Sequence, residues 1–194
     1  MKDKIILASK SKIRKEILNK NGITCEVIPS NIDEEEIKNS LIAEGATPLI
    51  ISKNLAELKS VKISKTKPDK IVLGADSVID LKGELISKPK NREEAFHILE
   101  KLNGKTHHLI SSVCISKNGS MIWNYSDSSS LKMKNLQKQD IKNYLSKLDD
   151  KILLAYGVYQ IESIGKILFD KIDGNENTIM GLPIEKIKGY LNQF

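Results

Sequence analysis

Hydrophobic positions along this chain fall into short continuous apolar runs and into longer segments with helical spacing, which predict buried strands and amphipathic helices in alternation. The apolar residues 5–8 (Ile-Ile-Leu-Ala) are typical of a buried strand. A polar loop follows, and then a helix whose apolar residues Ile13, Ile17 and Leu18 share one face. Gly22 fits the position just beyond the end of that helix. The chain therefore begins with a strand, a loop and a helix.

The centre of the chain predicts a second buried strand followed by hairpins. Residues 70–76 are largely apolar and end at Asp76, which places this carboxylate at the end of a strand. Lys82-Gly83 then indicates a tight turn. Asn118-Gly119, which separates two further β-rich runs, is the strongest hairpin signal in the chain.

Capping residues locate further helices. Thr47-Pro48 is typical of a helix start, as is Asn91 with Glu94 three residues later, and Gly104 fits the end of that second helix. We expect further strands around 24–28 and 166–171, and further helices around 140–148 and after Gly181-Leu182-Pro183. Strands and helices alternate without a low-complexity linker, so the sequence predicts an α/β fold and one domain over residues 1–194.

Composition narrows the function classes. The net charge is +6, from 31 Lys and Arg against 25 Asp and Glu, but the Lys residues are scattered, as on an ordinary solvated surface. Part of this charge could instead line a cleft that attracts polyphosphates. Aromatic residues make up 5% of the chain, too few for a nucleic-acid stacking surface, and we expect no nucleic-acid partner.

The chain gives no signal for export or membrane insertion. Its N-terminal apolar run is far too short for a signal peptide, and no later run approaches the length of a membrane span. Cys25 and Cys114 lack the paired spacing of a zinc site, so we expect reduced, buried thiols. These features predict a cytoplasmic protein without a membrane partner.

Several residues could carry chemistry, and each has an ordinary alternative. Ser9, Ser11 and Arg14 surround the start of the first helix, where an anion could bind, although a Ser there could equally cap the helix. Asp76 could cap a turn, or could project into a cleft as a metal ligand or general base.

Two charged sites close to these residues leave the same choice open. Lys88 follows the hairpin that begins near Asp76, so it places a cation near that carboxylate, or it is simply an exposed lysine. Asp33 and Glu34 could stabilise the start of a helix, or Glu34 could be a second carboxylate facing a metal.

Short motifs resemble those of the Maf nucleotide pyrophosphatase family, in the same order and over nearly the whole chain. Leu7-Ala8-Ser9-Lys10-Ser11-Lys12-Ile13-Arg14 resembles the family's Leu-Ala-Ser-x-Ser-x-x-Arg. The other similar segments are Ile32-Asp33-Glu34, Leu55-Ala56-x-x-Lys59, Gly74-Ala75-Asp76-Ser77-Val78, Ser87-Lys88-Pro89, Leu102-Asn103-Gly104-Lys105-Thr106-His107, Tyr159-Gln160-Ile161-Glu162 and Gly181-Leu182-Pro183. The chain departs from the pattern where Ile13 replaces a frequent Arg, Ser77 a Thr and Ser163 a Gly.

The resemblance implies a fold and a set of site residues. The fold would have a mixed central sheet flanked by helices and two lobes with a cleft, like inosine triphosphate pyrophosphatases, and a homodimer would be common. Asp76 would accept a proton, and Asp76 and Glu34 would hold Mg²⁺ or Mn²⁺. Side chains facing the nucleotide substrate would be those of Ser9, Ser11, Arg14, Lys59 and Lys88.

The resemblance also implies an activity, which is hydrolysis of the α–β phosphoanhydride of a nucleotide to a monophosphate and pyrophosphate. The alternative is a nucleotide-sensing protein of cell division without turnover. Glu162 stands where the 7-methyl-GTP branch of the family tends to have Glu and the dTTP and UTP branch Gln, or it simply pairs with a neighbouring Lys. Residues 168–178 agree with the first branch, whereas Gly74-Ala75-Asp76-Ser77 leans toward the second.

Overall fold

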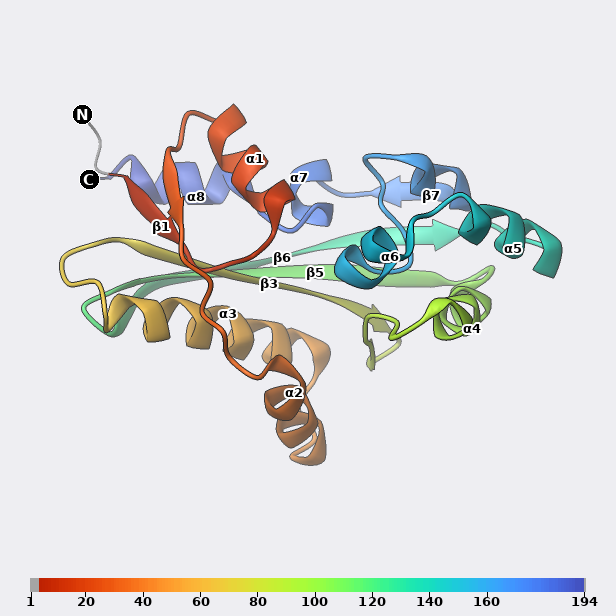
Figure 1. Ribbon diagram of the computed structural model, residues 1–194, viewed down its shortest axis with the longest axis horizontal. Helices are drawn as coiled ribbons and strands as arrows, with labels where there is room; N and C mark the ends of the chain where they lie inside the picture. Colours follow the sequence, from red (N-terminus) through yellow and green to blue (C-terminus); the bar gives the residue numbers. More distant parts are fainter. Residues whose placement is uncertain (1–3, 194) are drawn as a thin grey trace.

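The computed structural model describes residues 4–193, which form one seven-stranded mixed sheet with helices on both faces (Figure 1). The strands are β1 (Ile5–Leu7), β2 (Cys25–Val27), β3 (Val72–Leu81), β4 (Glu84–Ile86), β5 (Thr106–Lys117), β6 (Ser120–Met133) and β7 (Phe169–Asp173). The helices are α1 (Lys12–Lys20), α2 (Glu34–Ala43), α3 (Pro48–Ser64), α4 (Arg92–Leu102), α5 (Lys138–Ser146), α6 (Asp150–Tyr156), the 3₁₀ helix η1 (Ile164–Leu168), α7 (Glu176–Ile179) and α8 (Ile184–Leu191).

The sheet confirms the predicted fold class. Its strand order is β2-β1-β3-β5-β6-β7, and β4 pairs with β3. β1 runs parallel to β2 and β3, whereas the other pairs are antiparallel. In Figure 1, α3 lies along one face of β3 and β5, and α1 and α8 lie on the other side, beside β1.

Local signals placed the turns and helix starts correctly. Lys82 and Gly83 have φ values of 56° and 90°, and Asn118 and Gly119 have 51° and 79°, as a two-residue turn with a left-handed backbone at both positions requires. The predicted caps are also confirmed, because the side chains of Ser11, Thr47 and Asn91 accept hydrogen bonds from the first turns of α1, α3 and α4.

The strand predicted around 166–171 was placed too early. Residues 164–168 form the helix η1, and β7 starts only at Phe169. The cause is a tight turn, in which the Gly165 N–H donates to the Gln160 carbonyl and a Cβ on Gly165 would lie 2.5 Å from that oxygen. The sequence analysis also did not include the short helices α6 and α7, which Asp149 and Asn175 cap. The prediction that Asp76 ends a strand was wrong, because pairing with β5 keeps β3 extended as far as Leu81.

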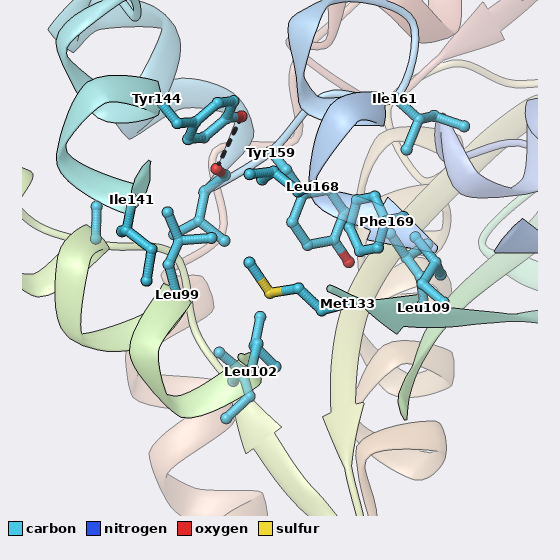
Figure 2. Packing of buried hydrophobic residues seen from close by; sticks show 14 of the residues in the cluster. Leu99, Leu102, Leu109, Met133, Ile141, Tyr144, Tyr159, Ile161, Leu168 and Phe169 are labelled. Carbon is cyan, nitrogen blue, oxygen red and sulfur yellow. Dashed lines mark hydrogen bonds between the residues drawn. The ribbon is translucent and has the colours of Figure 1, made fainter. Parts of the chain in front are cut away.

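Two hydrophobic cores lie at opposite ends of the sheet and form the two predicted lobes. One core joins β1, α1 and α8 through residues such as Leu7, Leu18 and Ile187. The other joins α4, α5 and the ends of the long strands, where Leu99, Leu102, Ile141, Tyr144, Met133 and Phe169 pack together (Figure 2). Cys25 and Cys114 are free and buried, and no helix among residues 4–193 is long and apolar enough to cross a membrane.

Gly74 allows α3 to approach β3 closely. A Cβ at this position would lie 2.1 Å from the Ala56 carbonyl oxygen and 2.8 Å from the Ser60 backbone nitrogen, both in α3. Because these are backbone atoms, they can yield only if the whole helix moves. The distance between α3 and the sheet therefore depends on a glycine at position 74.

We predict that Gly74→Ala lowers the free energy of unfolding by roughly 1–3 kcal/mol, the usual cost of overpacking a core. Gly189→Ala is the matched control, because its Cβ would meet nothing within 4 Å and Gly189 lies inside α8. The control should be neutral or up to about 1 kcal/mol more stable, since Ala favours a helix over Gly. Urea unfolding of the three proteins measures both effects, and equal stability of Gly74→Ala and the wild type would contradict the packing account.

Candidate active site

A cavity of about 500 Å³ lies between the two cores. Its walls come from the loop before α1, the start of α2, the middle of β3, the loop after β4, and the segments 155–162 and 179–181. The eight side chains that the sequence analysis selected all line this cavity: Ser9, Ser11, Arg14, Glu34, Lys59, Asp76, Lys88 and Glu162. Residues from six separate motifs thus meet at one place.

Lys59 joins the two predicted carboxylates. Its Nζ lies 2.9 Å from Asp76 Oδ1 and 2.9 Å from Glu34 Oε1. Lys59 and Asp76 are 5% and 4% exposed, whereas the Glu34 side chain is 45% exposed. A buried charge is tolerated when it is paired and hydrogen-bonded, so Lys59 and Asp76 make each other's burial possible, and Glu34 adds a second negative charge beside Lys59.

The second carboxylate oxygen of Asp76 has no partner. Oδ2 is buried and makes no hydrogen bond with any part of the chain that the structure describes. Leaving a buried acceptor unsatisfied costs free energy, and such atoms in folded proteins usually have a functional explanation. Asp76 lines the cavity, and this oxygen keeps the capacity to accept a proton or to bind a cation.

Lys88 and Glu34 have shifted pKa values. Burial lowers the pKa of Lys88, and the nearby Arg14 guanidinium lowers it further. Burial acts to raise the pKa of Glu34, but the Lys59 ammonium, together with Lys38 and Lys88, outweighs it, and the net direction is down. The Lys88 Nζ also donates a 2.6 Å hydrogen bond to the Ala155 carbonyl, so this lysine spans the cavity from the loop after β4 to the end of α6.

Hydrogen bonds join the loop before α1 to the first turn of that helix. Ser11 does cap the helix, because its Oγ accepts from the Arg14 backbone N–H at 3.3 Å. Ser9 Oγ accepts from the Ser11 N–H at 3.2 Å and from Arg14 Nη1 at 3.3 Å. Burial lowers the pKa of Arg14, while the charges of Asp76 and Glu34 oppose this shift.

Glu162 is an exposed side chain at the cavity wall. No lysine or arginine within residues 4–193 forms an ion pair with it, so the alternative that it only pairs with a nearby Lys finds no support. The sequence analysis did not select every residue of the site. Ser77 and Met180, for example, both line the cavity, and their sequence signal was that Ser77 lies in the motif around Asp76 and Met180 precedes the motif that begins at Gly181.

Comparison with known proteins agrees with the motifs. Residues 4–194 match the family described as Maf-like protein. The chain belongs to the Maf family. It is 62% identical over 98% of both chains to "Nucleoside triphosphate pyrophosphatase" of Pelagibacter ubique (strain HTCC1062). It is 36% identical to "7-methyl-GTP pyrophosphatase" of Brucella abortus biovar 1 (strain 9-941), over 93% of this chain and 91% of that protein.

Among solved structures, the Staphylococcus aureus Ham1 protein is similar to this Maf-family chain at 15% identity. The similarity covers 98% of this chain and 99% of that one, with a TM-score of 0.47. A likeness this distant supports no conclusion about function.

The far wall of the cavity in this Maf-family protein is held by a buried histidine. His107 Nε2 lies 2.8 Å from the hydroxyl of Tyr159, which lines the cavity and packs edge-on against Phe169. His107 Nδ1 is buried without a hydrogen-bond partner among residues 4–193. Burial, with a smaller contribution from His108, lowers the pKa of His107 to about 4.

We predict that His107 makes the folded protein less stable as the pH is lowered. The unfolded chain binds the proton near the ordinary pKa of 6.5 and the folded chain only near 4, so stability is lost as the pH drops through this window. Between pH 7 and pH 5 the loss should be about 2 kcal/mol. Urea unfolding at both values measures it. His107→Gln should show a correspondingly smaller pH dependence, whereas the exposed His97→Gln should behave like the wild type.

Proposed function

We propose that this protein hydrolyses the α–β phosphoanhydride of a nucleoside triphosphate, releasing a nucleoside monophosphate and pyrophosphate. The observation that carries the proposal is the cluster of Glu34, Lys59 and Asp76 at the cavity, in which one buried Asp76 oxygen has no hydrogen-bond partner among residues 4–193. The names of the relatives from Pelagibacter ubique and Brucella abortus support the same activity.

The proposed reaction assigns separate tasks to the charged side chains. Asp76 Oδ2 either accepts the proton of the water that attacks phosphorus or binds the divalent cation, while Lys59 fixes the carboxylate through Oδ1. Lys88 directs its charge toward the phosphates, after exchanging the Ala155 carbonyl for a phosphate oxygen. A cation aimed at charge that develops on the leaving pyrophosphate stabilises the transition state more than the ground state.

A divalent metal, Mg²⁺ or Mn²⁺, fits the donors of this site. The unpartnered Asp76 oxygen and the half-exposed Glu34 carboxylate are the ligands that would hold it. Within the described residues, no group of three or more His, Cys, Asp and Glu forms a complete metal cage. Mg²⁺ at phosphate sites commonly uses one or two carboxylates and the phosphates of the substrate. When bound, the ion supplies positive charge that offsets the negative charge of the phosphates.

We predict that Asp76→Asn lowers the turnover number by roughly 10²- to 10⁴-fold, because it removes the proton acceptor and preserves the shape of the side chain. Pyrophosphate release from dTTP, UTP, GTP and 7-methyl-GTP with Mg²⁺ or Mn²⁺ is the measurement. Asp80→Asn is the matched control, since Asp80 lies on the same strand but bonds to the Gly83 N–H outside the cavity.

The same assay decides between the alternatives. If the wild type releases pyrophosphate from none of these nucleotides, the alternative of a nucleotide-sensing protein without turnover remains. Near-normal turnover of Asp76→Asn would instead reduce Asp76 to a structural residue.

Within this function, we propose that Glu162 selects the base. The carboxylate can accept two hydrogen bonds from the N1 and N2 donors of guanine, and the positive charge of 7-methylguanine favours a carboxylate neighbour. A uracil or thymine edge offers one such donor and suits Gln better. The absence of an ion pair to Glu162 within residues 4–193 and its place on the cavity wall support this role.

We predict that 7-methyl-GTP, or a related purine nucleotide, is hydrolysed with a higher kcat/KM than dTTP, and that Glu162→Gln narrows this difference. Both nucleotides are measured with the wild type, Glu162→Gln and Glu185→Gln, whose exposed carboxylate lies outside the cavity. A wild-type preference for dTTP, or a ratio that Glu162→Gln leaves unchanged, removes Glu162 from base recognition.

A further inference from the structure

Arg14 gives most of its hydrogen bonds to the protein itself. Nε donates to the Gly181 carbonyl at 3.1 Å, and Nη1 donates to the Ala75 carbonyl at 3.0 Å and to Ser9 Oγ at 3.3 Å. Nη2 donates to Ser77 Oγ at 2.9 Å. A guanidinium has five N–H groups, so one remains for a ligand and the two-pronged grip on a phosphate is not available.

The hydrogen bonds continue beyond Arg14 in one direction. Ser77 Oγ and Ser111 Oγ lie 2.8 Å apart, and Ser111 Oγ donates to the Thr178 carbonyl at 2.7 Å. Each hydroxyl has a single hydrogen. Because the Ser111 hydroxyl donates its hydrogen to the Thr178 carbonyl, its oxygen must accept the hydrogen bond from the Ser77 hydroxyl. A chain of donors therefore runs from Arg14 through two serines to the backbone of α7.

These bonds hold one short segment at both of its ends. Thr178 is bound through its carbonyl to Ser111 and through its Oγ1 to Asp127 Oδ2 at 2.8 Å, and Gly181 is bound through its carbonyl to Arg14. The fit at Gly181 is tight, since φ is 103° and a Cβ would lie 3.0 Å from Arg14 Nε and 3.2 Å from Ser77 Oγ. Between these anchors, residues 179–181 form a wall of the cavity.

We infer that Ser77 and Ser111 are positioning residues, which act through Arg14 and Thr178 to fix the wall 179–181 against the nucleotide. Arg14 is then the clamp of this wall and contributes one hydrogen bond, not two, to a phosphate. The inference rests on the proposed function only in naming a nucleotide as the molecule that this wall contacts. The clamp itself is a property of the folded chain.

Hydrogen exchange tests the clamp without any nucleotide. In Ser77→Ala, the amides of Met180, Gly181 and Leu182, which bond to carbonyls within residues 176–178, should exchange about tenfold faster, as expected when local opening becomes easier. Ser77→Thr keeps a hydroxyl and should restore slow exchange. Ser112→Ala is the control, because Ser112 follows Ser111 on β5 and is as buried as Ser111, but its hydroxyl bonds to Ser126 instead.

Kinetics with 7-methyl-GTP and Mg²⁺ test what the wall contacts. Ser77→Ala and Ser111→Ala should raise KM several-fold to about tenfold and leave kcat within about twofold, the pattern expected when ground-state and transition-state binding are lost together. Arg14→Lys should raise KM as well, although it preserves the charge, because an ammonium cannot reach the four acceptors together. Ser77→Thr should restore KM, and Ser112→Ala should leave both constants unchanged.

The outcomes separate the two proposals. Unchanged exchange at 180–182 in Ser77→Ala overturns the clamp, whatever the kinetics show. Faster exchange with an unchanged KM overturns the role of the wall in nucleotide binding. A wild type that releases pyrophosphate from no nucleotide defeats the proposed function, while the exchange experiment still decides the clamp.

Discussion

The site depends on a buried ammonium group that two carboxylates neutralise. Lys59 enters the cavity from α3 and contacts Asp76 on β3 and Glu34 at the start of α2. Neither Lys59 nor Asp76 would be stable here alone, because an unpaired buried charge costs several kcal/mol. The pairing in turn requires α3 to lie against the sheet at a distance that only glycine at position 74 permits.

Arg14 forms a second centre that organises the opposite side of the cavity. The guanidinium bonds to the loop before α1, to β3 and to the segment before α8, which are far apart in the sequence. Asp76 lies between the two centres, since the Ala75 carbonyl accepts hydrogen bonds from both Lys59 and Arg14. The free Asp76 oxygen is therefore held at a fixed place by groups that are themselves fixed.

The balance of charge in the cavity suits a polyanionic ligand that arrives with a cation. Lys59 is already neutralised by Asp76 and Glu34, whereas among the described residues Lys88 bonds to a carbonyl oxygen and to no carboxylate, and burial together with Arg14 lowers its pKa. A phosphate would satisfy Lys88 better than the Ala155 carbonyl does, because a hydrogen bond between opposite charges is stronger than one to a neutral acceptor. Asp76 Oδ2, which accepts no hydrogen bond from the described residues, is negatively charged and therefore suits a proton or a metal ion instead.

Local chemistry in the sequence determined much of this protein. The turns at Lys82-Gly83 and Asn118-Gly119 and the caps at Ser11, Thr47 and Asn91 follow from backbone preferences within a few residues, and the structure confirms them. Family motifs selected eight side chains that the structure brings to one cavity. Only the tertiary structure showed that Lys59 bridges two carboxylates, that Ser77 continues a hydrogen-bond chain from Arg14, and that Gly165 delays β7. These features join residues distant in sequence or depend on the close approach of two backbones, and local patterns carry no information about either.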